Sequence, residues 1–373
     1  MRLRREIIEL STQEGANRRA LCRRFGISPK TACKWLRRAR QPDAPDLVDR
    51  SRRPHHSPAR TVPVIEAAVL GVRAQHPAWG GRKIARRLAD LAMAHLAPST
   101  VTGILHRHGC LTEATGAPSV AWVRVEHPEP NQLWQIDFKG YFDTARERCH
   151  PLTLLDDHSR FNLTLHACQR TGASSIEPLL SAVFRRYGLP VRINGDNGAP
   201  WGAPREAAHG LSRLVVWLIR IGVSVSHSRP YHPQTNGKDE RFHRSLQAEV
   251  LNGRGFADLA AVQRAFDDWR TVYNCERPHE ALGLATPASR YRPSPREFPE
   301  QLPAIEYGPN DTVYRVPPNG WLRIAGRRVK VSNALTGLPI GVRSSTTEEG
   351  VLDFYFCHQR FMRWDLRQPG HRE

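Results

Sequence analysis

Trp134-Gln-Ile-Asp-Phe-Lys-Gly140 is a short strand-forming stretch that sets one carboxylate, Asp137, among apolar neighbours. Two later stretches also hold an acid within a distinctive local pattern, namely Asp196 in Gly195-Asp-Asn-Gly198 and Glu240 in His232-Pro-Gln-Thr-Asn-Gly-Lys-Asp-Glu-Arg241. The three acids are 59 and 44 residues apart, so only a folded domain can bring them together. Carboxylate oxygens are the ligands that hard divalent cations prefer. Two such cations about 3.5–4 Å apart can stabilise both the attacking and the leaving oxygen of a phosphodiester.

The sequence around these acids predicts alternating strands and helices. Strand-like runs come first, then an apolar helical stripe, and strands and helices then alternate. The expected elements are strands over 133–138, 149–155 and 161–167, a helix around 176–184, a strand over 191–194, a helix over 206–221, a strand over 223–227 and a helix from Gly237. The order βββαβαβα predicts an α/β RNase H-like domain with a five-stranded mixed sheet, which we place at residues 128–295.

This order predicts where each acid lies. Asp137 falls in the first strand, Asp196 just after the fourth, and Glu240 in the first turns of the helix after the fifth. The neighbouring Asp239 is separated from Glu240 by helical phase, because it points toward the side of Phe242. Glu240 is therefore the better ligand candidate. Asp156 and Asp157, at a strand end, are expected to form a turn.

The amino-terminal region concentrates positive charge. The chain has 55 Lys and Arg against 36 Asp and Glu, which gives a net charge of +19. Residues 1–60 alone hold 16 of the Lys and Arg residues but only 6 of the Asp and Glu residues. Residues 1–45 have helix-turn-helix spacing, with a turn at Gly26 and an N-cap at Ser28. The second helix would present its Lys and Arg side chains to a DNA major groove. The alternative to a DNA-binding unit is an ordinary helical hairpin with a basic surface. The candidate DNA-binding residues are Lys30, Lys34, Arg37 and Arg38.

Three further segments complete the expected organisation. Residues 46–61 are a Pro- and Arg-rich linker, in which Arg52 and Arg53 are candidate DNA contacts or part of a solvated tether. Residues 62–112 predict a second helix-turn-helix-like unit, with Ser99 and Thr100 capping its last helix. Residues 300–373 predict a small β-rich domain, with strands over 311–316, 321–331, 338–343 and 351–356. The basic side chains of this domain are consistent with DNA contact, and a purely structural domain is the equal alternative.

Cysteine usage and hydropathy limit the compartment. The seven cysteines contain no C-x-x-C pair, which is typical of reduced, cytosolic proteins. The longest apolar stretch, residues 214–219, is too short to cross a bilayer. We expect a cytoplasmic, nucleoid-associated protein that does not contact membranes.

The chain resembles bacterial insertion-sequence transposases of the retroviral-integrase-like class, which have an Asp-Asp-Glu catalytic triad. The resemblance covers roughly residues 15–292 and rests on the order of its motifs. They are Leu47-Val-Asp-Arg-Ser-Arg-Arg-Pro54, Trp134-Gln-Ile-Asp-Phe-Lys-Gly140, Leu154-Leu-Asp-Asp-His-Ser-Arg-Phe161, Gly195-Asp-Asn-Gly198, Arg229-Pro-Tyr-His-Pro-Gln-Thr-Asn-Gly237, Glu240-Arg-Phe-His-Arg-Ser-Leu246 and Tyr273-Asn-x-x-Arg-Pro-His279.

The resemblance implies a function for the three acids. Asp137, Asp196 and Glu240 would bind two Mg²⁺ (or Mn²⁺) ions per active site, hydrolyse the ends of the element and join the freed 3′-hydroxyls to target DNA. Such proteins act on double-stranded DNA as homodimers or higher multimers. Asp239 departs from the resemblance, since relatives commonly have an apolar residue there. We expect Lys238, Arg241 and Arg244 to contact DNA phosphates near the site.

Two other functions suit part of the pattern. A catalytically silent, domesticated copy would bind terminal repeats without cutting, although the intact triad favours activity. An RNase H-like nuclease acting on other nucleic acids would not need two amino-terminal DNA-binding units.

Overall fold

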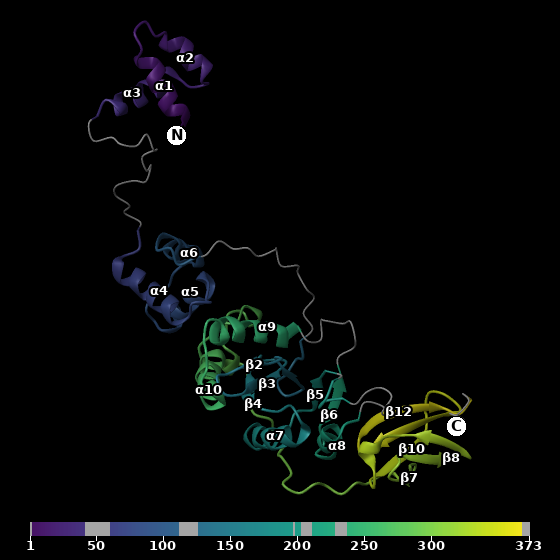
Figure 1. The fold of residues 1–373 in the computed structure, drawn as a ribbon. Coiled ribbons are helices and arrows are strands. Elements are labelled where there is room, and N and C mark those ends of the chain that lie inside the picture. The colour runs from purple at the N-terminus through teal and green to yellow at the C-terminus, as the bar shows by residue number, and fades with distance from the viewer. Residues whose placement is uncertain are drawn as a thin grey trace. The chain divides into compact units, whose positions relative to one another are not determined.

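The computed structural model describes residues 2–41, 60–111, 126–196, 198–202, 211–227 and 237–367. The chain forms two compact units, residues 1–61 and 62–373, which are drawn in Figure 1. In the described residues, no helix is long and apolar enough to cross a membrane.

The first unit is a three-helix module of α1 (Arg2–Thr12), α2 (Arg18–Arg24) and α3 (Pro29–Ala39). The turn between α2 and α3 contains Gly26 at φ +62°, a conformation that glycine adopts without strain. Ser28 Oγ accepts a hydrogen bond from Thr31 N–H at 3.1 Å and so caps α3. Buried apolar residues from all three helices, Ile7, Cys22 and Leu36, form a small core. The predicted helix-turn-helix and its cap are confirmed.

A second three-helix module opens the larger unit, with α4 (Pro63–Gln75), α5 (Gly81–Asp90) and α6 (Pro98–Arg107). The fully buried Trp79 and Leu88 lie at the centre of its core. The expected cap at Ser99 and Thr100 is wrong. Helix α6 begins at Pro98 after the N-cap residue Ala97, because proline fits the first helical position, where no amide hydrogen is needed.

The central domain is built on a mixed sheet. Its strands are β1 (Leu133–Phe138), β2 (Phe142–Asp143), β3 (Arg148–Asp156), β4 (Asn162–Cys168), β5 (Arg192–Gly195) and β6 (Ser224–His227). They are ordered β2-β3-β1-β5-β6, with β4 also paired to β3. The first three long strands are antiparallel, and β5 and β6 run parallel to β1. The expected five-strand arrangement is present, and the two-residue β2 adds to it.

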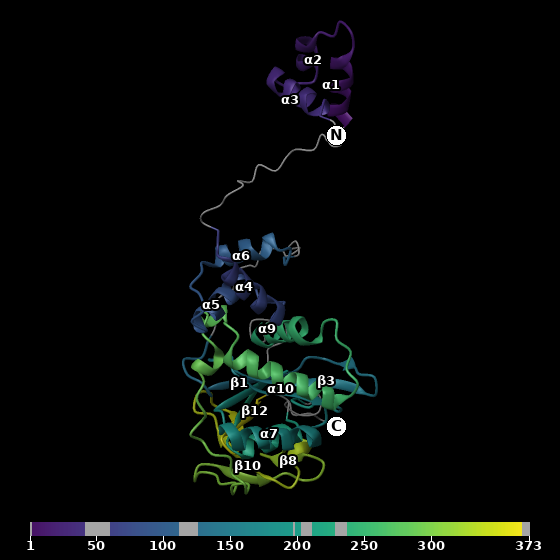
Figure 2. The same cartoon turned by 90° about the vertical axis from the view of Figure 1, so that its left-hand side faces the viewer.

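Helices cover both faces of this sheet (Figure 2). Helices α7 (Ala173–Tyr187) and α8 (Arg213–Arg220) pack on one face, in a core that includes Leu152 and Leu154 of β3. Helices α9 (Gly237–Leu246) and α10 (Leu259–Cys275) pack on the other face, in a core that includes Leu155 and Leu165. Successive strand residues point to opposite faces, which explains why adjacent leucines enter different cores. A π-helical turn, Gln247–Leu251, follows α9 directly.

The last part of the chain is a β domain. A four-stranded sheet, β12-β11-β10-β7, consists of β7 (Thr312–Arg315), β10 (Pro339–Ser344), β11 (Val351–Phe356) and β12 (Gln359–Asp365). The single strand expected over 321–331 is instead a hairpin of β8 (Trp321–Ile324) and β9 (Arg327–Lys330). Ala325 and Gly326 both have positive φ, as a two-residue hairpin turn requires. Strand β12 was not predicted.

Candidate active site

Two of the predicted acids lie at neighbouring strand ends. Asp137 is in β1, which pairs in parallel with β5, and Gln135 is aligned with Asn194. Asp137 and Asp196 therefore both lie two residues beyond an aligned pair, at the same edge of the sheet. The Asp137 side chain is 28% exposed and its Oδ1 accepts a hydrogen bond from Phe138 N–H at 2.8 Å. Burial and the negative charge of Asp196 raise the pKa of Asp137 to about 6. The sheet thus brings the two carboxylates together.

Glu240 lies in the first turns of α9 and is exposed, whereas the adjacent Asp239 is buried. The predicted helical phase is confirmed, because Asp239 shares its side of the helix with the buried Phe242. The face that bears Glu240 continues to His243 and Gln247, three and seven residues later. Within the described residues, no cluster of three His, Cys, Asp or Glu side chains is close enough to hold a metal ion.

His243 connects this face of α9 to the strand that holds Asp137. Thr153, opposite Asp137 in β3, donates its hydroxyl hydrogen to the Asp137 carbonyl oxygen at 3.0 Å. That hydroxyl has one hydrogen, so His243 Nε2–H must donate to Thr153 Oγ1, 3.0 Å away. His243 Nδ1 then faces Asp137 Oδ2 at 4.0 Å. Burial and nearby Lys139 lower the pKa of His243 to about 4, so the ring is neutral near pH 7.

Lys139 makes a second connection between the same elements. It lies two residues after Asp137 and therefore on the same side of the chain. Its Nζ donates to Gln247 Oε1 at 2.6 Å. Sequence reasoning did not single out Thr153 or Lys139. The period of two along β1 could have indicated Lys139, but Thr153 could be found only from the register between β1 and β3.

Asp239 is a buried acid without full hydrogen bonding. Asp239 is only 3% exposed, and its Oδ1 has no hydrogen-bond partner among the described residues. Burial, followed by the charges of Asp137 and Asp157, raises the pKa of Asp239 well above its usual value. The fold therefore disfavours a charged Asp239 and leaves Glu240 accessible.

The Lys238 side chain is largely buried in an ion pair. Its Nζ forms an ion pair with Asp157 Oδ1. The same buried carboxylate accepts hydrogen bonds from Gln135 Nε2 at 2.8 Å and from the His127 N–H at 3.1 Å. Burial opposes the charge on Asp157, but Lys238 and His127 hold its pKa below the usual value. The ion pair joins the start of α9 to the end of β3, and the DNA contact of Lys238 stays a prediction.

The other basic candidates fall into two groups. Arg241 and Arg244 are exposed on α9, and on α3 Lys30, Lys34 and Arg37 are exposed while Arg38 is partly buried. Their DNA contacts stay predictions. Arg52 and Arg53 lie outside the described residues.

Asp156 has the expected turn-forming role. Its Oδ1 accepts hydrogen bonds from Ser159 N–H and Oγ at 2.7 and 2.6 Å, and its Oδ2 accepts one from Asn131 N–H at 2.7 Å. The bonds from Ser159 close the turn between β3 and β4, and the bond from Asn131 ties this turn to the segment before β1.

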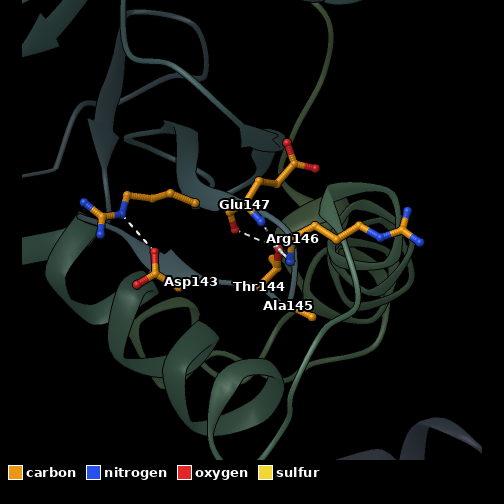
Figure 3. A pocket seen from close by; sticks show the side chains of 6 residues that line it. Asp143, Thr144, Ala145, Arg146 and Glu147 are labelled. Atoms are coloured by element: carbon orange, nitrogen blue, oxygen red, sulfur yellow. Dashed lines mark hydrogen bonds and ion pairs between the residues drawn. The ribbon is translucent and has the colours of Figure 1, made fainter.

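A shallow hollow lies elsewhere, on the β2–β3 hairpin (Figure 3). It is lined by residues 143–148. Arg148 Nε donates to Asp143 Oδ1 at 2.9 Å, and Thr144 exchanges hydrogen bonds with the Glu147 backbone. The lining side chains thus bind one another across a tight turn, and none of the three predicted acids lies there.

Comparison with known protein families identifies the domains. Models of the integrase core domain match residues 127–233 and 221–287. Homeodomain-like models match residues 1–48 and 31–105, and the C-terminal domain of the IS481 family transposases matches residues 311–371. The central domain is therefore an integrase core. Homeodomain-like matches precede this core and a match to the C-terminal domain of the IS481 family transposases follows it, which agrees with the resemblance to insertion-sequence transposases.

Similar curated proteins agree with this assignment. An uncharacterized protein of insertion element IS476 from Xanthomonas euvesicatoria is 28% identical over 163 residues, which is 43% of this chain and 44% of that protein. An uncharacterized protein of insertion element IS407 from Burkholderia multivorans is 26% identical over 159 residues, 43% of this chain and 54% of that protein. The chain spans about half the length of these relatives.

Solved structures of retroviral integrases are also similar to this chain. One is a simian T-cell lymphotropic virus intasome in complex with a PP2A regulatory subunit, at 15% identity and a TM-score of 0.38, covering 78% of this chain and 97% of the matched chain. Another is the HTLV-2 integrase catalytic core domain in complex with magnesium, at 13% identity and a TM-score of 0.33, covering 44% of this chain and 99% of the matched chain.

Proposed function

We propose that this chain binds the terminal inverted repeats of its own insertion sequence, hydrolyses the DNA at those ends and transfers the 3′-hydroxyl ends to target DNA. The observation that carries the proposal is that Asp137 and Asp196 lie near each other at the adjacent ends of β1 and β5. Glu240 would complete the set from α9. The integrase core, the flanking DNA-binding domains and the net charge of +19 all support DNA as the substrate.

The residues of the site suit a divalent cation. Asp137 and Asp196 are oxygen ligands of the kind that Mg²⁺ and Mn²⁺ prefer. Within the described part of the chain, neither carboxylate has a Lys or Arg partner, and the charge of Asp196 adds to burial in raising the pKa of Asp137. Two carboxylates held together without a cationic partner favour a bound cation. We propose that Asp137, Asp196 and Glu240 hold two Mg²⁺ or Mn²⁺ ions.

When bound, this metal pair would stabilise the attacking and leaving oxygens of the phosphodiester. The chain's own residues have supporting tasks. Thr153 and His243 hold the β1 segment around Asp137 against α9. Arg241 and Arg244 project from the same helix, where they can bind phosphates and fix the register of the DNA. The Lys and Arg side chains of α3 would read the sequence of the terminal repeat in the major groove.

Partners and location follow from this substrate. Joining two element ends to one target requires at least two active sites, so we propose a homodimer or higher multimer on double-stranded DNA. We place the protein at the bacterial nucleoid in the cytoplasm, where such DNA lies.

The test uses purified protein and DNA that bears the sequences flanking its gene, incubated with Mg²⁺ or with EDTA. Strand breaks are mapped at nucleotide resolution. Metal-dependent breaks at defined ends, with products joined to a second DNA, would support the proposal. Tight end-specific binding without breaks would contradict it and indicate a catalytically silent copy, and breaks without sequence preference would indicate a nuclease.

A further inference from the structure

Strand β6 lies at the edge of the integrase-core sheet, and one side chain from the β domain bonds the outward backbone groups of its residue Val225. Gln359, the first residue of β12, accepts a hydrogen bond from Val225 N–H at 2.8 Å and donates one to the Val225 carbonyl oxygen at 3.0 Å. A primary amide has one acceptor and one donor side by side, as a backbone peptide of a neighbouring strand would. Next to it, His358 Nε2 and Ser224 Oγ are 3.1 Å apart. Gln359 therefore acts in place of one residue of a missing neighbouring strand.

Helix α8 makes the contact between the two domains extensive. Its Leu214 and Leu218 enter the core of the central sheet, whereas Val215, Val216 and Ile219 enter the core of the carboxy-terminal β domain. A helix that is apolar around its whole circumference is buried on all sides, and here the two domains bury it together. The β domain is thus packed firmly against the α8–β6 edge.

Two side chains of β6 form hydrogen bonds with β5 and with Asp196, the candidate catalytic acid that follows β5. Ser226 Oγ donates to Asn194 Oδ1 at 3.0 Å. His227 Nδ1 lies 2.9 Å from the carbonyl oxygen of Asp196, so the ring must donate there. Asp196 is exposed and directly follows Gly195, the last residue of β5, which is aligned with His227 of β6. A hydrogen bond from β6 therefore holds the backbone of Asp196.

The charges on the β domain support a bracing role over a DNA-binding one for its main sheet. Arg343 pairs with Asp311 at 2.6 Å, and Arg360 and Arg363 both pair with Asp353, at 3.4 and 3.3 Å. These arginines are already neutralised within the domain. Their pairing removes much of the positive charge that the sequence suggested for phosphate contact.

We propose that Gln359 is a positioning residue for DNA cleavage: by completing the hydrogen bonds of edge strand β6 from the β domain, it holds the Asp196 backbone at the active site. This role rests on the proposed function above, because Asp196 must act in cleavage for its position to matter. The β domain then contributes to catalysis through the contact between the Gln359 side-chain amide and Val225.

The test compares full-length wild type with Gln359→Met, which keeps the side-chain length but loses both hydrogen bonds, and with Gln359→Glu, which keeps the acceptor and loses the donor. Gln301→Met, at an exposed position, is the matched control. Hydrogen exchange is followed in peptides that cover residues 223–227. Single-turnover cleavage, DNA affinity and the Mg²⁺ concentration for half-maximal rate are measured on the same preparations.

We expect Gln359→Met to exchange the Val225 amide at least about tenfold faster and to cleave about tenfold more slowly, and Gln359→Glu, which keeps the acceptor of that amide, to fall between Gln359→Met and wild type in both measurements. DNA affinity should stay within about twofold, the half-saturating Mg²⁺ concentration should rise severalfold, and the control should match wild type. Unchanged exchange at β6 would overturn the proposal. Faster exchange with normal cleavage and normal Mg²⁺ dependence would also overturn it, since the contact would then be structural only.

Failure of the proposed function gives a different result. If wild type binds DNA but never cleaves, the proposed function fails, and the exchange data with Mg²⁺-induced thermal stabilisation still test whether Gln359 positions the metal-binding edge. Loss of that stabilisation in Gln359→Met but not in the control would support the positioning role, and equal stabilisation would overturn it.

Discussion

Replacing Asp137 by asparagine should stabilise the metal-free protein while removing its response to metal. The fold raises the pKa of Asp137 from 3.8 to about 6, chiefly by burial and then by the charge of Asp196. Each pKa unit corresponds to about 1.4 kcal/mol, so keeping this carboxylate charged at pH 7 costs the folded state at most about 3 kcal/mol. Solvent reaches part of the side chain, which lowers the figure to about 2 kcal/mol. Asparagine removes the charge and keeps the oxygen that accepts the Phe138 N–H.

The pH dependence has a definite sign. Because the pKa of Asp137 is higher in the folded state than in the unfolded state, the folded protein takes up a proton first as pH falls. The cost is therefore fully present above about pH 6 and disappears below about pH 4. The stability difference between Asp137→Asn and wild type should be largest near pH 7 and close to zero near pH 4.

Thermal unfolding of the two proteins, with EDTA and with Mg²⁺, checks this prediction. In EDTA at pH 7, Asp137→Asn should unfold about 4 °C higher than wild type, since about 2 kcal/mol shifts the midpoint of a domain this large by a few degrees. Mg²⁺ should raise the wild-type midpoint and leave the variant unchanged. A variant less stable than wild type in EDTA, or equal responses to Mg²⁺, would refute the electrostatic account of the site.

Three further predictions concern other parts of the molecule. Asp239→Ala should raise the free energy of unfolding by about 1 kcal/mol, measured by urea denaturation, because it removes a buried acid whose Oδ1 is unpaired; destabilisation would show that the carboxyl has a partner in solution. Lys238→Met should lower stability by about 3 kcal/mol in the same assay by leaving Asp157 buried without its cation, and an effect below about 1 kcal/mol would contradict the ion pair. Deleting residues 1–61 should abolish end-specific binding and reduce the slope of log affinity against log salt by at most about 4, the loss expected if Lys30, Lys34, Arg37 and Arg38 each neutralise one phosphate; specificity that survives the deletion would exclude α3 as the reader.

The sequence predicted the features that depend on local pattern. The period of apolar residues located the strands around Asp137, and the helical phase separated Glu240 from Asp239, because both rest on the repeat of one element. The Ser28 cap and the Gly26 turn were likewise local. The turn at Ala325-Gly326 was missed although it too is local, because alanine rarely adopts the positive φ that splits this stretch into a hairpin.

Features that join distant segments could not be predicted from one sequence. The pairing of Lys238 with Asp157 depends on how α9 packs over β3, and an exposed basic residue and a buried one look alike in sequence. Thr153 became part of the site through strand register, and Gln359 through the packing of a strand that was not predicted. These contacts arise between elements that are far apart along the chain.

The central claim is that Glu240, and not its neighbour Asp239, acts with Asp137 and Asp196 in metal-dependent cleavage. The most direct test compares Glu240→Gln with Asp239→Asn, two isosteric changes at adjacent positions, in cleavage and DNA binding with Mg²⁺. We predict that Glu240→Gln abolishes strand breaks while DNA affinity stays within about twofold, and that Asp239→Asn still cleaves. Cleavage retained in Glu240→Gln and lost in Asp239→Asn would contradict the account, because the buried acid would then be the one that acts.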